Sequence, residues 1–177
     1  MSQYPTHISS PEYKKYITQQ RDADAKESDY KWSAGDTIRT AIGQSYNNYT
    51  SALRSKYVAT LANGGTRYSM HFLNKITNND GKTEEEYQPK VESKIEIKKE
   101  NLDAIFKGMF LVTTGPRGTL RNYFKDFPVD VAAKSGTAQQ SSKRSEHTTF
   151  VAFAPLEDPQ ISVCVIIPFG NGTTGPA

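Results

Sequence analysis

The segment from Ile161 to Pro168, ISVCVIIP, constrains the fold of this chain more than any other stretch. It is apolar at almost every position, which is typical of a strand that is buried on both faces. Two further strand-like runs precede it, from Val129 to Ala138 and from Thr148 to Ala154. We therefore predict an antiparallel sheet formed by these three strands. We also predict that other elements cover both faces of its last strand.

Helices that can cover such a sheet are predicted earlier in the chain. The longest runs from Lys98 to about Val112 and is ended by Gly115 and Pro116. Its apolar side chains recur at helical spacing and share one face: Leu102, Ile105, Phe106, Met109 and Phe110. An amphipathic helix of this kind has to pack against a sheet or another helix, and the three strand-like runs supply the sheet.

Shorter helices are predicted from their N-terminal caps. Ser10, Asp36 and Thr50 each precede a helical pattern, and their side-chain oxygens can accept from the free N–H groups of a first turn. The helix after Asp36 is expected to be brief, and the helix after Thr50 to end in a left-handed cap at residues 63–65, Asn-Gly-Gly. Residues 20–31, QRDADAKESDYK, are charged and lack periodicity, so we expect a solvated loop or linker there.

A hairpin is predicted between the helices. Residues 66–77 and 82–88 have strand character, and Asn78-Asn79-Asp80-Gly81 is a strong turn signal between them. The fold class is therefore α+β, with helices first and an antiparallel sheet last. Residues 1–31 are predicted to form a polar N-terminal segment and linker, and residues 32–177 to form the folded part.

Composition excludes several classes of function. The chain has 177 residues, 36% of them hydrophobic, which suits one domain with a core. A net charge of +3 is too small to indicate a nucleic-acid-binding surface, so we expect no nucleic-acid partner. Cys164 is the single cysteine and the three histidines lie far apart, so we expect no structural metal. No apolar run is long enough for a signal peptide or spanning helix, and the chain as given is expected to be soluble.

The segment most suited to chemistry is Lys134-Ser135-Gly136-Thr137 with Gln139 close behind. It offers a cation, two hydroxyls and a backbone edge without a side chain at the glycine, all at the end of an apolar strand. Such an edge can hold an anionic, peptide-like ligand. The alternative is a strand that ends in an ordinary polar turn. We assign His147 to the strand surface and Cys164 to the core, and we favour neither as a reactive group.

Several segments together resemble the transpeptidase domain of penicillin-binding proteins of the class B, monofunctional type. Residues 134–139, KSGTAQ, are similar to the third motif of that family. Further similarities follow the family's order: residues 35–37 with 41–44, 57–65, 108–109 with Val112, and 150–155. The resemblance covers roughly residues 32–170 and implies the fold shared by penicillin-binding proteins and serine β-lactamases, so residues 32–177 would be the C-terminal part of such a domain.

The resemblance implies a function and roles for the motif. The family's enzymes are serine D-Ala-D-Ala transpeptidases that cross-link peptidoglycan stem peptides and are acylated by β-lactams, with no cofactor. Lys134 and Thr137 are implied as catalytic residues, through positive potential and through one N–H of the oxyanion hole. Ser135, Gly136, Thr137 and Gln139 are implied as substrate-binding residues.

The family's other two motifs are expected to lie before the part of the domain that this chain matches. These are Ser-x-x-Lys, which carries the nucleophile, and Ser-x-Asn. Ser28 with Lys31 fits the first pattern, but lies in a charged stretch without an apolar helix to desolvate the lysine. Ser45 with Asn47 fits the second at a position where the family has a small residue. We interpret both matches as accidental and expect the chain to be inactive on its own.

A second hypothesis, of a different class, is a penicillin-recognising fold that serves as a non-catalytic binding or regulatory module. Under the first hypothesis, the partners are peptidoglycan stem peptides, β-lactam antibiotics and a glycosyltransferase, in cell-wall elongation or division. The intact bacterial protein would be membrane-anchored with an extracellular catalytic domain. We also expect the chain to self-associate through the strand 161–168, because a long apolar edge is a template for pairing.

Overall fold

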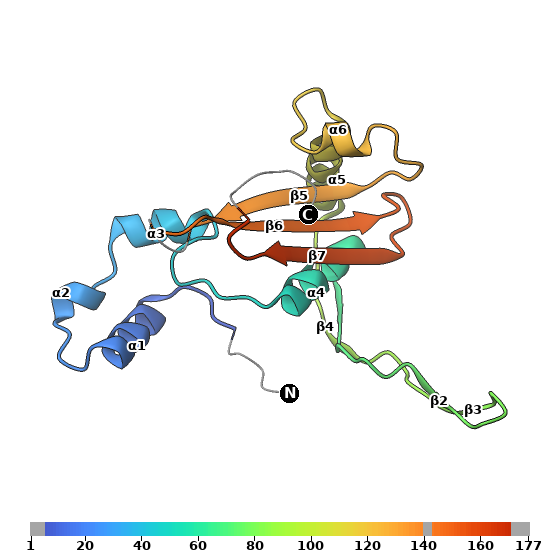
Figure 1. The fold of residues 1–177 in the computed structure, drawn as a ribbon, viewed down its shortest axis with the longest axis horizontal. Coiled ribbons are helices and arrows are strands. Elements are labelled where there is room, and N and C mark those ends of the chain that lie inside the picture. Colours follow the sequence, from blue (N-terminus) through green and yellow to red (C-terminus); the bar gives the residue numbers. More distant parts are fainter. Residues whose placement is uncertain (1–5, 140–142, 171–177) are drawn as a thin grey trace.

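A computed structural model of the chain describes residues 6–139 and 143–170, and its centre is an antiparallel sheet (Figure 1). The three strands of this sheet lie in the order β5-β6-β7: β5 (Ala132–Ala138), β6 (His147–Ala154) and β7 (Ile161–Ile167). The register is regular, with Ala133 opposite Ala152 and Ala152 opposite Val163. The predicted strands and the α+β class are confirmed.

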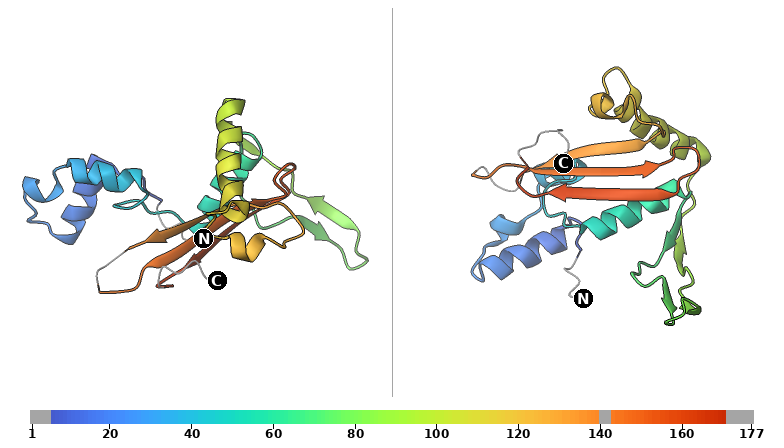
Figure 2. Two further views of the ribbon diagram at one scale, coloured as in Figure 1. Left: turned by 90° about the horizontal axis from the view of Figure 1, so that it is seen from above. Right: turned by 45° about the vertical axis from the view of Figure 1, so that its right-hand side comes forward.

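The helices cover the two faces of this sheet unequally. On one face lie α4 (Ser51–Ala62) and α5 (Lys99–Thr114), and on the other, among the described helices, lies the short α6 (Arg121–Phe124), as Figure 2 shows. Val58 of α4 packs with Ala132 and Phe153 on the first face. On the second face Leu120 packs with Val131, Ala133 and Ala152, beneath α6.

The prediction that β7 is covered on both faces is wrong. Ile161, Val163 and Val165 are 59%, 37% and 37% exposed, while Ser162 and Cys164 between them are half-buried. The α4 helix packs on the Ser162 side of β7, where the Ser55 and Ser162 hydroxyls approach to 3.1 Å. The α6 helix lies at the β5 side of the opposite face, so it leaves Ile161, Val163 and Val165 open.

Two of the three predicted helix caps are confirmed and one is corrected. Ser10 accepts from Tyr13 N at the start of α1 (Pro11–Arg21), and Thr50 accepts from Leu53 N at the start of α4. The cap of α3 (Ala34–Ala41) is Ser33, whereas Asp36 lies at the third helical position and completes a capping box. Both residues are good caps three positions apart, and the helix begins at the earlier one.

The segment predicted as a loop contains a short helix, α2 (Glu27–Tyr30). Its Asp29 carboxylate accepts from Lys26 N, a local contact that closes one turn without any apolar periodicity. The α1, α2 and α3 helices together form a lobe beside the sheet (Figure 1). The division of the chain between residues 31 and 32 stays a prediction.

A two-stranded ribbon projects from the body of the protein (Figures 1 and 2). It contains four strands in two antiparallel pairs, β1 (Thr66–Tyr68) with β4 (Val91–Lys94) and β2 (Lys75–Thr77) with β3 (Thr83–Glu86). The predicted turn at Asn78–Gly81 is confirmed, with Gly81 in the left-handed region at φ 79°. The single strand predicted over residues 66–77 is wrong, because β1 and β2 are separated and β1 pairs with a strand that the sequence did not indicate.

None of the described helices is both long and apolar enough to cross a membrane.

Candidate functional site

The predicted motif lies on β5, at one side of the sheet. Within the described residues β5 pairs with β6 alone, so its other backbone edge faces away from the sheet. Lys134 and Ser135 lie opposite Val151 and Phe150, and Thr137 lies opposite Thr148. Gln139 follows the strand and is exposed. The residues grouped by the sequence are therefore brought together along one open edge.

Strand alternation divides the motif between the two faces of the sheet. Lys134 shares a face with Val151, which packs in the cluster beneath α4 and α5, whereas Ser135 shares the opposite face with Phe150. Thr137 lies on the Ser135 face because it is two residues further along. A ligand that contacts the ammonium and both hydroxyls therefore has to lie along the edge of β5, where the two faces meet.

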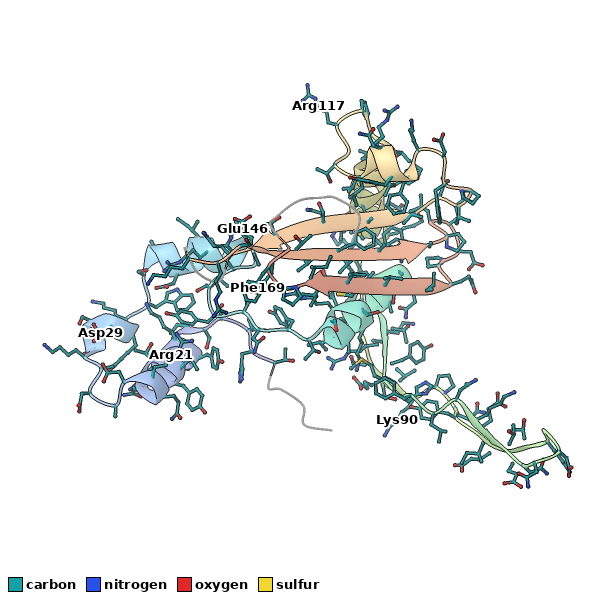
Figure 3. All side chains as sticks on the ribbon, viewed as in Figure 1. Arg21, Asp29, Lys90, Arg117, Glu146 and Phe169 are labelled. Carbon is teal, nitrogen blue, oxygen red and sulfur yellow. The ribbon has the colours of Figure 1, made fainter. Side chains whose placement is uncertain are left out.

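Lys134 lines a hollow of about 480 Å³ between β5 and the end of α5. The other walls are Gly108, Leu111 and Val112 of α5 and the loop 115–119. Arg117 and Lys134 are the charged residues of this lining, so the charge of the hollow is positive. The Lys134 ammonium donates to the Ser135 carbonyl oxygen. Figure 3 shows Arg117 on the loop beyond α5, pointing outward.

Sequence reasoning missed Thr119. Its Oγ1 lies 3.3 Å from Ser135 Oγ, and it also lines the hollow. No local signal could have identified this threonine, because its approach to Ser135 depends on how the loop after α5 folds back onto the sheet.

The neighbouring strand gives a further reason for a residue without a side chain at Gly136. A Cβ built at Gly136 would lie 2.5 Å from Thr149 Oγ1 on the neighbouring strand, so a side chain there would force the Thr149 hydroxyl to move. The glycine therefore leaves room for the Thr149 hydroxyl in its present position, as well as open access along the edge.

The region around His147 borders the far end of the motif. His147 is the first residue of β6, lies opposite Ala138 and is half-buried. Its Nδ1 accepts from Phe169 N at 3.3 Å, and the two rings are 4.8 Å apart. Figure 3 labels Phe169 beside the end of β7.

Cys164 is half-buried, and burial raises the pKa of its thiol, which fits a packed residue.

The residues that match the family's other two motifs make local contacts. Ser28 lies on the exposed helix α2 and donates to Asp29 Oδ1 at 3.2 Å, and Lys31 is exposed. Figure 3 places Asp29, the neighbour of Ser28, on the α1–α3 lobe. Asn47 is used structurally, since its Oδ1 accepts from Ser9 N and its Nδ2 donates to Gln44 O. Ser45 is exposed and has a left-handed backbone with φ 70°.

In the parts of the chain that the structure describes, no cluster of three or more histidine, cysteine, aspartate or glutamate side chains could hold a metal ion. The groups that β5 and its surroundings provide are an ammonium, a guanidinium, hydroxyls and backbone amides. These groups bind carboxylates and stabilise oxyanions.

The family model and the relatives that match this chain indicate the same protein family. Residues 13–176 match the family model described as the penicillin binding protein transpeptidase domain. The peptidoglycan D,D-transpeptidase MrdA of Escherichia coli K12 is 34% identical over 160 residues, which are 82% of this chain and 25% of that protein. Penicillin-binding protein 2B of Streptococcus pneumoniae D39 is 31% identical over 154 residues, 81% of this chain and 22% of that protein.

A solved structure agrees with these matches. Pseudomonas aeruginosa PBP2, in complex with WCK 5153, superposes with a TM-score of 0.69 at 30% identity, over 94% of this chain and 33% of that chain. The chain thus spans about a quarter of the length of the curated relatives it matches.

Proposed function

Because this chain belongs to the penicillin-binding protein transpeptidase family and is similar to its class B members, we propose that it supplies the ligand-binding strand of a serine D,D-transpeptidase site. The observation that carries the proposal is the open edge of β5, where Lys134 borders a positively charged hollow and two hydroxyls follow on the other face. The proposed substrate is a peptidoglycan stem peptide that ends in D-Ala-D-Ala, and the proposed inhibitors are β-lactams.

The proposed reaction is acyl transfer. A serine hydroxyl gives up its proton as its oxygen bonds to the carbonyl carbon of the penultimate D-alanine, and the bond to the terminal D-alanine nitrogen breaks as that nitrogen takes the proton. The nitrogen of an amine on a neighbouring stem peptide then bonds to the same carbon and loses a proton, and the bond to the serine oxygen breaks as that oxygen takes a proton. Lys134 provides positive potential beside the serine, and the Thr137 N–H is one donor of the oxyanion hole. The Ser135 and Thr137 hydroxyls bind the terminal carboxylate, beside Gly136 and Gln139.

We further propose that this chain carries no nucleophile of its own and is inactive by itself. Ser28 is the one serine in the sequence that is followed by lysine at the third position. Neither Ser28 nor Lys31 is desolvated, whereas a lysine that acts as a base for serine has to lose its proton near neutral pH. The serine would then come from a segment outside these residues, in a membrane-anchored protein that works with a glycosyltransferase outside the cell membrane.

Non-covalent binding to the chain tests this proposal directly. Nitrogen-15-labelled chain is titrated with benzylpenicillin and, separately, with N-acetyl-D-Ala-D-Ala, while the backbone amide signals are followed. We expect millimolar binding with the largest shifts at residues 134–138, and loss of these shifts in Thr137→Val. Thr77→Val, which removes a hydroxyl from an exposed strand position on the ribbon, is the matched control and should bind normally. Shifts elsewhere only, or unchanged shifts in Thr137→Val, would contradict the proposal.

A further inference from the structure

The contact between Thr119 and Ser135 joins two hydroxyls from distant parts of the chain. Thr119 Oγ1 and Ser135 Oγ are 3.3 Å apart, and both side chains are accessible from the edge of β5. We propose that Thr119 is a positioning residue, which orients the Ser135 hydroxyl so that its proton points toward the carboxylate of the ligand. This inference rests on the function proposed above, in which Ser135 binds that carboxylate.

The loop that carries Thr119 is held rigidly against the end of α5. Gly118 N donates to Gly115 O at 2.8 Å, and Leu120 N donates to Val112 O at 3.0 Å. A Cβ at Gly118 would lie 2.5 Å from Val112 O, so the loop backbone approaches the helix as closely as glycine permits. Leu120, directly after Thr119, is buried in the core. Thr119 is thus held between a fixed turn and a core residue.

The end of α5 is in turn tied to the chain that leads into β5. Thr113 is buried, and its Oγ1 donates to Val131 O at 2.7 Å. Leu120 and Val131 belong to one core cluster with Ala133 of β5. The loop and the strand therefore share a packed base, and the distance between Thr119 and Ser135 is set by the core rather than by two free side chains.

Hydroxyl chemistry explains why this contact matters for an anion. A serine hydroxyl has one proton, and it binds a carboxylate only by donating that proton. When Thr119 donates to Ser135 Oγ, the serine proton is directed away from Thr119 and is available for the carboxylate. Hydrogen bonds in such a chain polarise one another, so Thr119 also strengthens the bond from Ser135 to the anion.

The variant that tests the inference is Thr119→Val, which keeps the shape of the side chain and removes its hydroxyl. We expect it to weaken benzylpenicillin binding by about fivefold, the usual effect of one hydrogen bond. Thr119→Ser restores the hydroxyl and should restore binding. The matched control is Thr114→Val, because the Thr114 hydroxyl is exposed and donates only to Phe110 O within its own helix. Thermal unfolding should be alike in the Thr119 variants and the unsubstituted chain.

A double-mutant cycle separates positioning from general damage. In a Ser135→Ala background Thr119→Val should cause no further loss of binding, because there is no serine hydroxyl to orient. Normal binding by Thr119→Val, or equal losses with and without Ser135, would overturn the role of Thr119 while leaving the proposed function intact. An unsubstituted chain that binds neither benzylpenicillin nor N-acetyl-D-Ala-D-Ala would overturn both.

Discussion

Lys14 and Asp36 form a buried ion pair that joins the first and third helices of the α1–α3 lobe. The Lys14 Nζ to Asp36 Oδ2 distance is 2.9 Å, and the two side chains are 10% and 0% exposed. Asp36 also accepts from the Ser33 N–H and hydroxyl, and Lys14 donates to Lys31 O. One carboxylate therefore completes the capping box of α3 and anchors α1 to it.

Asp36→Asn should destabilise this lobe by about 3 kcal/mol, because it leaves the Lys14 ammonium buried without its counter-charge. The single tryptophan, Trp32, donates from Nε1 to Thr37 Oγ1 and reports unfolding of the lobe by fluorescence in urea. Arg39→Gln is the control, because the Arg39 side chain is 58% exposed and its ion pair with Asp36 should matter little. Equal urea midpoints for Asp36→Asn and the unsubstituted chain would contradict this prediction.

The same carboxylate predicts a dependence of stability on pH. Hydrogen bonds from Lys14 and then from Ser33 hold the pKa of Asp36 well below its usual range. A carboxyl whose pKa is lower in the folded state stabilises that state above its unfolded pKa, about 3.9, and loses this effect as the pH falls further. The urea midpoint reported by Trp32 should thus fall below about pH 4, and the difference between the unsubstituted chain and Asp36→Asn should shrink. A difference that stays constant from pH 6 to pH 2 would exclude Asp36 as the cause.

The chain should not form a covalent adduct with a fluorescent penicillin. Acylation needs a serine oxygen activated by a nearby base, and the Ser28 hydroxyl donates to Asp29 in an exposed helix. Mass spectrometry of the intact chain after incubation should show its unmodified mass, with E. coli MrdA as the positive control. Labelling that disappears in Ser28→Ala would show that this serine is reactive after all.

Lys134 should be essential for rapid acylation when this chain is combined with a segment that carries the reactive serine. In a hybrid that carries residues 13–176 in place of the matched segment of E. coli MrdA, Lys134→Ala should slow acylation by fluorescent penicillin about a hundredfold, through loss of a preorganised charge. Lys125→Ala, which removes an exposed lysine outside the motif and outside the lining of the hollow, should leave the rate unchanged in the same hybrid. An unaltered rate in the Lys134 variant would remove this lysine from the site.

The open edge and outer face of β7 should make the chain self-associate. Val163 and Val165 are each 37% exposed on the face away from α4, and β7 ends the sheet in the described part of the chain. Light scattering across a dilution series should show a dimer or larger assembly that Val163→Lys and Val165→Lys dissociate. Val91→Lys, at an exposed position on the ribbon, should have no such effect. A chain that is monomeric at high concentration would contradict the prediction.

Local chemistry is sufficient to predict much of this fold. The Ser10 and Thr50 caps, the apolar stripe of α5 and the turn at Asn78–Gly81 depend on residues within a few positions of one another, and the structure has all of them. The same reasoning misplaced the cap of α3, because Ser33 and Asp36 both suit that role. The contact from Lys14 that buries Asp36 comes from a distant helix and leaves no local signal.

In the candidate site, too, some features follow from neighbouring residues and others from contacts between distant segments. The sequence alone determined that a lysine, two hydroxyls and a glycine lie together on a strand, because they are neighbours along the chain. Strand alternation then places Lys134 and Ser135 on opposite faces of the sheet. The tertiary structure decided that Thr119 meets Ser135 and that one face of β7 is open. These features depend on where α4, α5 and the loop 115–119 pack against the sheet, and such packing is set by the shapes of surfaces far apart in the sequence.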